Sequence, residues 1–249
     1  MRIALLSTDG RDDIVEGFVK FAERFWPDRP WPIEVIKGDP EGSYSKRILS
    51  YLKSIPDEVL MIAMDDFWPY PSVNQAEIDR AYHHILNGQS IGAIHLLPCN
   101  STQASCPDLP GFKFIGVRDA DRSSNGASLT RRQYMLEITE QIGCRLDEEQ
   151  DAGIIGMTYW ELHANHIGSH WNVLCPEPTN RVFSRINAAA EAQWREETIA
   201  LVAKMGIDLD MTKRPLWDGK FPHWDRWSRL YSPAYEDFPI HDATLRDTV

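Results

Sequence analysis

The amino-acid sequence predicts an α/β protein with a mostly parallel central sheet flanked by helices. Over the first hundred residues, short apolar runs alternate with segments whose apolar residues recur at helical spacing. This alternation is typical of parallel sheets, whose strands are joined by helical crossovers. The apolar run at 58–64 ends abruptly in two adjacent carboxylates, Asp65 and Asp66. Ligands of open α/β sheets bind beside the carboxyl ends of strands, so this strand end is a candidate site.

Each element of the N-terminal half follows from a local pattern. Residues 2–7 form an apolar run that predicts the first strand, and Val15, Phe18 and Ala22 then recur at helical spacing over 14–25. Asp12 or Asp13 is a candidate helix N-cap. Three prolines then break the helix and lead into a strand. The further predicted elements are a strand at 33–36, a helix starting at Ser43, a strand at 58–64, a helix at 74–86 and a strand at 91–97.

The second half is predicted less regularly. A loop rich in Pro, Ser, Asn and Cys spans 98–110. The patterns then predict a strand at 112–117 and helices at 131–142, 149–167 and 183–205, the last of these Ala-rich and Glu-rich. After Gly206 the chain becomes an irregular segment rich in aromatic residues.

Composition predicts one soluble domain. The 249 residues suffice for a single well-buried α/β domain, which we divide into 1–100, 101–205 and an extension at 206–249. The start of the chain lacks a signal-peptide core, and no apolar run spans a bilayer, so we expect a cytoplasmic protein. The formal net charge of -11 argues against a broad electrostatic grip on nucleic acid.

The acid pair has two interpretations. Asp65 and Asp66 could be a solvated strand end or a helix cap. Alternatively they form a site, and because like charges repel at a few ångströms, a divalent cation would be their natural counter-charge. Oxygen atoms of a phosphate group are the usual further ligands of such a cation.

Four ordered motifs within residues 1–70 carry a resemblance to a known family. They are Ser7-Thr8-Asp9, the segment Trp26-Pro27-Asp28-Arg29-Pro30-Trp31-Pro32-Ile33, the helix start Ser43-Tyr44-Ser45-Lys46-Arg47, and Asp65-Asp66-Phe67. In this order they resemble a bacterial and viral branch of the nucleotide-sugar glycosyltransferases of the GT-A type. The resemblance fades beyond about residue 170. It implies a GT-A-like, Rossmann-type sandwich and a sugar transfer from a nucleotide sugar, with UDP as the nucleotide. Residues 1–100 would then bind the nucleotide sugar, and residues 101–205 would face the acceptor.

The resemblance also implies roles for individual residues. Asp66 would be a direct ligand of Mn²⁺ or Mg²⁺, with Asp65 contacting sugar or ribose hydroxyls, although the two roles could be exchanged. Thr8 and Asp9 would contact the base or ribose, and Lys46 and Arg47 the diphosphate. In the competing interpretation, Asp9 forms a turn that caps the next helix. Lys46 and Arg47 then belong to a solvated helix face. Glu161 is the candidate general base, with Asp151 as the alternative, and His163, His166, His170 or His223 could supply a third metal ligand.

The acceptor is open at this point. Trp217, Trp224 and Trp227 lie among basic residues in the C-terminal extension, and indole rings stack on sugars and on nucleobases. They could equally pack on the domain. A glycan is the preferred acceptor, and hydroxymethylated DNA bases are the alternative.

An acceptor in DNA would require a local set of cations, because the chain as a whole is acidic. The candidates for such a set are Arg118, Arg122, Arg131 and Arg132, together with Lys213, Arg214, Lys220, Arg226 and Arg229 in the C-terminal extension. Two further classes of protein compete with a glycosyltransferase. They are a nucleotidyltransferase, which also uses paired acids and a metal, and a non-catalytic protein that binds a nucleotide sugar.

Overall fold

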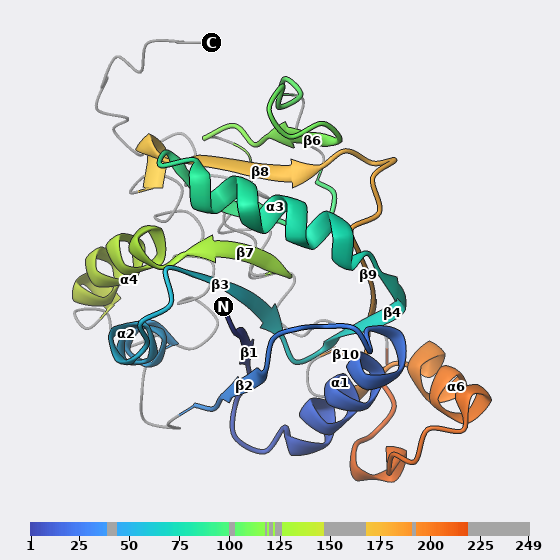
Figure 1. The fold of residues 1–249 in the computed structure, drawn as a ribbon. Helices are drawn as coiled ribbons and strands as arrows, with labels where there is room; N and C mark the ends of the chain where they lie inside the picture. Colours follow the sequence, from blue (N-terminus) through green and yellow to red (C-terminus); the bar gives the residue numbers. More distant parts are fainter. Residues whose placement is uncertain are drawn as a thin grey trace.

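The structure is a computed structural model that describes residues 1–38, 44–99, 103–117, 119, 122, 126–146, 168–190 and 193–218. A seven-stranded mixed sheet forms its centre (Figure 1), with the strand order β2-β1-β3-β7-β5-β8-β6. The strands in this order are β2 (Ile33–Ile36), β1 (Ile3–Leu6), β3 (Val59–Met64), β7 (Ser128–Arg131), β5 (Ile91–His95), β8 (Asn172–Pro176) and β6 (Phe112–Phe114).

The sheet combines parallel and antiparallel pairs. Strand β1 pairs in parallel with β2 and with β3, and β5 pairs in parallel with β8. Strand β7 runs antiparallel between β3 and β5, and β6 is antiparallel to β8 at the edge. The carboxyl ends of β1 and β3 therefore meet at one edge of the sheet, where Leu6 is in register with Met64.

Helices cover both faces of the sheet. Alternate residues of β1 and β3 enter two separate cores, because successive side chains of a strand point to opposite faces. Helices α1 and α3 contribute to the core that holds Ile3 and Met61, whereas α2 and α4 contribute to the core that holds Ala4 and Leu60. The bounds are α1 (Asp12–Phe25), α2 (Tyr44–Ser54), α3 (Gln75–Asn87) and α4 (Arg132–Leu146).

A second, smaller sheet continues from the end of β3. Strand β4 (Phe67–Val73) follows the acid pair directly and pairs antiparallel with β9 (Phe183–Asn187). A short hairpin of β10 (Ala189–Ala190) and β11 (Gln193–Trp194) then leads into α6 (Glu196–Met205), which lies beside α1 (Figure 1). Short 3-10 turns lie at Gly168–His170 and Met211–Lys213.

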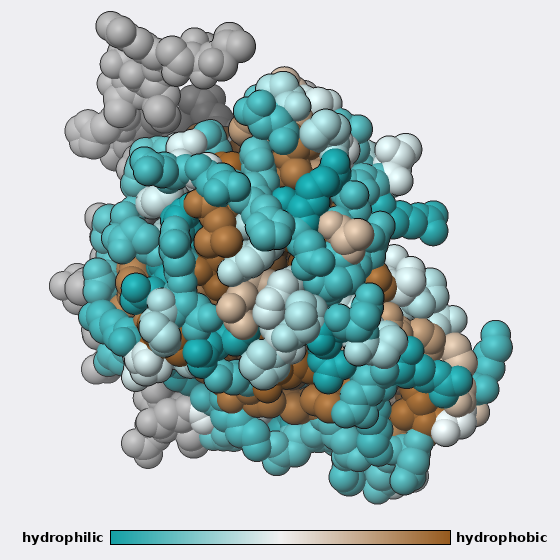
Figure 2. Space-filling model, in the orientation of Figure 1, coloured by the Kyte–Doolittle hydropathy of each residue, from teal (hydrophilic) through white to brown (hydrophobic). Residues whose placement is uncertain are grey.

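The face of the molecule seen in Figure 2 is mostly hydrophilic, and apolar residues show there only in patches between polar ones. Among the described residues, Val35 and Leu216 are the large hydrophobic residues with exposed side chains. No helix within the described ranges is long and apolar enough to cross a membrane.

The mixed α/β architecture confirms the predicted fold class. The helix predicted at 183–205 is wrong over its first half, where the chain forms β9 and the β10–β11 hairpin, and helix α6 begins only at Glu196. Strand pairing overrides the helix propensity of the alanines at 188–190. The helix predicted at 149–167 lies outside the described residues.

Trp68 joins the two sheets to α1. Its indole is fully buried, and its Nε1 donates hydrogen bonds to the carbonyl oxygens of Ile14 (3.1 Å) and Asp65 (3.0 Å). A Cβ added at Gly17 of α1 would overlap this indole. The small residue at 17 is therefore required by the close approach of helix and ring.

We predict that Gly17→Ala lowers the free energy of unfolding by about 1–3 kcal/mol, since overpacking a filled core displaces its neighbours. Urea denaturation followed by tryptophan fluorescence measures the change. Glu23→Ala, at an exposed position of the same helix, is the control and should change stability by less than about 0.5 kcal/mol. Equal stability of Gly17→Ala and the wild type would contradict the packing argument.

Candidate active site

The acid pair forms the turn between β3 and β4, next to the end of β1. Asp65 is fully buried, and its Oδ2 accepts a hydrogen bond of 2.6 Å from Oγ of Ser7. The guanidinium of Arg11 lies between the two carboxylates, with Nη2 3.0 Å from Oδ1 of Asp65 and 3.7 Å from Oδ2 of Asp66. Three segments of the chain thus converge on one buried carboxylate.

Burial dominates the electrostatics of both acids. It raises the pKa of Asp65 to about 6, although the Arg11 guanidinium and the Ser7 hydroxyl favour the ionised form. The pKa of Asp66 is also raised, again by burial and against the effect of Arg11. Near neutral pH the pair therefore holds its charge at a cost, which a positively charged or hydrogen-bond-donating ligand would reduce.

From the sequence, a divalent cation was expected to balance the charge of the two carboxylates. In the structure, Arg11 supplies part of this counter-charge. It precedes α1 and was not among the predicted site residues. Its local signal is weak, because a basic residue before a helix is ordinarily solvated. Only the meeting of the β1 and β3 ends places it beside two carboxylates.

Asp66 fits a metal ligand better than Asp65 does. Oδ1 of Asp65 and Oδ1 of Asp66 are both buried and make no hydrogen bond within the described part of the chain, which is unusual for carboxylate oxygens in a native protein. The two atoms differ in that Oδ1 of Asp65 lies 3.0 Å from Nη2 of Arg11. Asp65 would have to share its Oδ1 with Arg11. Within the described part of the chain, no group of three or more His, Cys, Asp or Glu residues could hold a metal ion.

The predicted donor-binding residues lie at the same edge of the sheet. Thr8 and Asp9 are exposed directly after β1. Lys46 is exposed on α2, whereas Nη1 of Arg47 donates a hydrogen bond of 2.9 Å to the carbonyl oxygen of Ser7. Arg47 therefore has a structural role in tying α2 to the end of β1.

Several predicted site residues lie outside the described ranges. These are Asp151, Glu161, Trp224 and Trp227, together with His163, His166 and His223. His170 is described, and its Nε2 lies 3.1 Å from Oε2 of Glu137 on α4.

Trp217 packs against the hairpin that precedes α6. Its backbone N–H donates a hydrogen bond of 2.8 Å to the carbonyl oxygen of Trp194, and the guanidinium of Arg195 lies 5.0 Å from its ring centroid. The ring is half-buried. This placement agrees with the packing alternative for Trp217.

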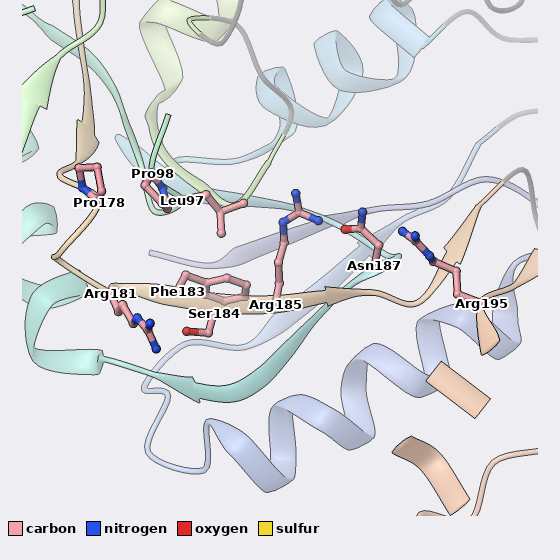
Figure 3. A pocket seen from close by; sticks show the side chains of 9 residues that line it. All are labelled: Leu97, Pro98, Pro178, Arg181, Phe183, Ser184, Arg185, Asn187 and Arg195. Atoms are coloured by element: carbon pink, nitrogen blue, oxygen red, sulfur yellow. The ribbon is translucent and has the colours of Figure 1, made fainter. Parts of the chain in front are cut away.

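A pocket of about 520 Å³ lies on β9 (Figure 3). Its lining consists of Leu97, Pro98, Pro178, Arg181, Phe183, Ser184, Arg185, Asn187 and Arg195. Asn187 is in register with Phe67, and the backbone N–H of Ala188 donates to the carbonyl oxygen of Asp66 (2.7 Å), so the pocket adjoins the acid pair. The sequence did not indicate this site, because the residue pattern at 183–205 predicts a helix where β9 forms.

Three arginines considered as contacts for DNA are used inside the protein. The guanidinium of Arg122 is buried and donates to the carbonyl oxygens of Ile115 (2.9 Å) and Gly168 (3.0 Å). Arg131 is buried and pairs with Glu58. Arg214 binds the buried carboxylate of Asp13 through two nitrogens, each 2.6 Å from an oxygen. Asp13 therefore pairs with Arg214, and no side-chain cap forms at the start of α1.

The comparisons with known proteins find similarity only among solved structures. No protein-family model matches the sequence, and no curated protein matches it. The crystal structure of A197 from STIV is 8% identical with a TM-score of 0.40, covering 78% of this chain and 89% of that one. A glycosyltransferase involved in the glycosylation of the major capsid of PBCV-1 is 12% identical with a TM-score of 0.40, covering 72% of this chain and 83% of that one.

We predict that Asp65→Asn becomes more stable relative to the wild type as pH rises from 4 to 7. The folded-state pKa of about 6 lies above the ordinary value of 3.8. Stability associated with the protonated carboxyl is thus present below pH 4 and is lost as pH rises through 6. The difference between the two pKa values corresponds to about 3 kcal/mol.

Urea denaturation at pH 4, 5, 6 and 7 measures this trend as a difference between variant and wild type. The loss of the contacts with Ser7 and Arg11 adds an offset that does not change the direction. Asp28→Asn, at an exposed position after α1, is the control. A difference that is constant over this pH range would show that the pKa of Asp65 is not raised in the folded protein.

Proposed function

We propose that this protein is a glycosyltransferase that moves a sugar from a nucleotide sugar to a hydroxyl group of an acceptor. The observation that carries the proposal is the acid pair, held by Ser7 and Arg11 where the carboxyl ends of β1 and β3 meet. Carboxylates accept hydrogen bonds from sugar and ribose hydroxyls, and guanidinium groups bind phosphate oxygens. A nucleotide sugar presents both kinds of group within one molecule.

The donor would lie across the edge formed by the ends of β1 and β3. Thr8 and Asp9 are exposed there and could contact the base or ribose, and Lys46 is exposed on the adjoining helix α2. UDP is the nucleotide that the four N-terminal motifs favour. Asp65 would orient a hydroxyl of the donor through its carboxylate, which the Ser7 hydroxyl holds in place.

Mn²⁺ or Mg²⁺ is proposed as the cofactor, with Asp66 as its protein ligand through the unpartnered Oδ1. When bound, such an ion would offset the charge that develops on the departing nucleoside diphosphate. Arg11 is placed to hold the acid pair together and to balance part of its charge before any ligand arrives.

A glycan is the proposed acceptor. The alternative, a hydroxymethylated base in DNA, needs a set of surface cations. Arg122, Arg131 and Arg214, which were among the candidates for that role, make internal hydrogen bonds instead. In the general-base role, Glu161 or Asp151 would take the proton from the acceptor hydroxyl. Trp224 and Trp227 would stack on the acceptor's sugar rings.

We predict that Asp66→Asn removes the effect of manganese on UDP binding and nearly abolishes sugar transfer. Calorimetry of UDP with and without Mn²⁺ measures the first, and release of nucleoside diphosphate from UDP-sugars in the presence of an acceptor measures the second. The wild type should bind UDP at least about tenfold more tightly with Mn²⁺, a change of about 1.4 kcal/mol. The Asn variant should show no such difference.

Asp28→Asn serves as the matched control, because it removes an exposed carboxylate outside the turn that holds the acid pair. An identical response to Mn²⁺ in Asp66→Asn and in the wild type would remove Asp66 as a ligand. Release of pyrophosphate from UTP supplied with a sugar 1-phosphate, without release of UDP from UDP-sugars, would identify a nucleotidyltransferase. Binding of UDP-sugars without any turnover over a broad acceptor panel would favour a non-catalytic binding protein.

We also predict that Glu161→Gln lowers the turnover number by at least about a hundredfold, because a general base contributes a factor of this size. UDP affinity should stay within about twofold of the wild type, since the base acts on the acceptor hydroxyl. Steady-state kinetics beside UDP calorimetry separates the two effects. Near-normal turnover in Glu161→Gln, with a strong loss in Asp151→Asn, would transfer the role to Asp151.

A further inference from the structure

The pocket on β9 has a wall of positive charge, and none of the described residues that line it is acidic. Arg185 and Asn187 are two residues apart on β9, so both side chains point to the same side of the strand (Figure 3). The guanidinium of Arg195 lies on that side next to Asn187. Arg181 also lines the pocket, but its side chain points the opposite way. The convergent polar groups are therefore Arg185, Asn187 and Arg195.

Arg185 is held in place without a carboxylate partner. Its Cζ lies 3.7 Å from the ring centroid of Phe67, and the side chain is half-buried. Among the described residues, no hydrogen bond or salt bridge engages its guanidinium. Burial lowers the pKa of Arg185, and the neighbouring charge of Arg195 lowers it further, whereas Asp66 opposes this effect. Two cations in a partly buried wall carry an electrostatic cost that an anionic ligand would relieve.

The other two polar groups of the wall, Asn187 and Arg195, each have a buried atom that makes no hydrogen bond within the described residues. Oδ1 of Asn187 is buried and has no hydrogen-bond partner in the described structure. Nε of Arg195 lies 2.8 Å from Oε1 of Glu197, an exposed carboxylate that does not line the pocket. Buried polar atoms are normally satisfied, so the amide oxygen of Asn187 beside two guanidiniums points to a missing ligand. An amide of this kind can bind a sugar hydroxyl as donor or acceptor.

The pocket is distinct from the proposed donor edge. None of Thr8, Asp9, Lys46, Arg47 or Asp65 lines it. Its remaining walls are largely apolar and come from Leu97, Pro98, Pro178 and Phe183. A volume of about 520 Å³ is within the usual range of small-molecule sites and suits one or two sugar rings.

We propose that this pocket binds the acceptor, and that the acceptor is a sugar bearing an anionic group, either a carboxylate or a phosphate. The anion would lie between Arg185 and Arg195, the Asn187 amide would bind a hydroxyl, and the apolar wall would contact the ring. This inference rests on the proposed function, because it names the second substrate of the same reaction. The adjoining position of Asp66 would place the bound acceptor next to the donor.

Titrations of the whole protein with glucuronate, glucose 6-phosphate and glucose test the proposal, without any need for sugar transfer. Saturation-transfer NMR gives the affinities. The two anionic probes should bind at least about tenfold more tightly than glucose, and Arg185→Gln and Arg195→Gln should each weaken their binding at least about tenfold. Lys204→Gln is the control, because this cation is exposed on α6 and does not line the pocket.

A second variant tests whether a loss of binding could result from misfolding. Arg185→Lys keeps the charge and loses the forked geometry, so it should bind the anionic probes better than Arg185→Gln. Circular dichroism verifies that each variant folds. Equal losses in the Lys204, Arg185 and Arg195 variants would show diffuse attraction and overturn the proposal. Equal affinity for glucose and for the anionic probes would overturn it as well.

A competition experiment separates the acceptor from the diphosphate of the donor. UDP and glucuronate should bind at the same time, and neither should displace the other. Mutual exclusion would assign the arginines to the diphosphate and overturn the proposal. If UDP binds but neither anionic probe does, this inference fails and the proposed function stands. If the probes bind through Arg185 but UDP does not bind, the anion site stands and the proposed function fails.

Discussion

The buried carboxylate of Asp65 is the constraint on which the site depends. A fully buried acid is tolerated only where its surroundings supply donors and counter-charge, and here Ser7 and Arg11 do so. Its own backbone is held as well: the N–H donates to the carbonyl oxygen of Leu6 (3.1 Å) and the carbonyl accepts from the Trp68 indole. Strand β1, the start of α1 and strand β4 must therefore be in place before Asp65 can be buried. The same turn then fixes Asp66. The carbonyl oxygen of Asp66 accepts a hydrogen bond from the backbone N–H of Ala188, which places the end of β9 beside the site.

Hydrogen bonds join the C-terminal part of the described chain to α1. Arg214 binds Asp13 with both ends of its guanidinium fork, a geometry that favours a single orientation. Arg24 on α1 donates to the carbonyl oxygen of Met205 at the end of α6 (2.7 Å). These contacts join α6 and the segment after it to α1, which itself carries Arg11 at its start. The hairpin that positions Arg195 is thus supported from the same helix as the acid pair.

The N-terminal half was predictable from the sequence because its strands carry their signal locally. Val59 to Met64 is a continuous apolar run, as expected of a strand buried on both faces. Strand β7 was not predicted, because its polar residues are buried only through hydrogen bonds and ion pairs. Strand β4 contains Pro69 and Pro71, which mark an edge strand and conceal its pairing with β9. The acid pair was found from its position after β3, whereas Arg11 and Arg185 gain their meaning from contacts that no local pattern encodes.

The charged groups around Asp66 couple the binding of one ligand to the binding of another. Arg11 lies on one side of Asp66, and Arg185, with Arg195 beyond it, acts on Asp66 from the β9 wall. An anion bound at Arg185 and Arg195 would reduce the positive field at Asp66 and make its carboxylate a better acceptor for a cation or a hydroxyl. A cation bound at Asp66 would in turn strengthen anion binding beside it. A cation at Asp66 and an anion at Arg185 and Arg195 would then favour each other's binding, and since coupling of this kind is reciprocal, either ligand would prepare the site for the other.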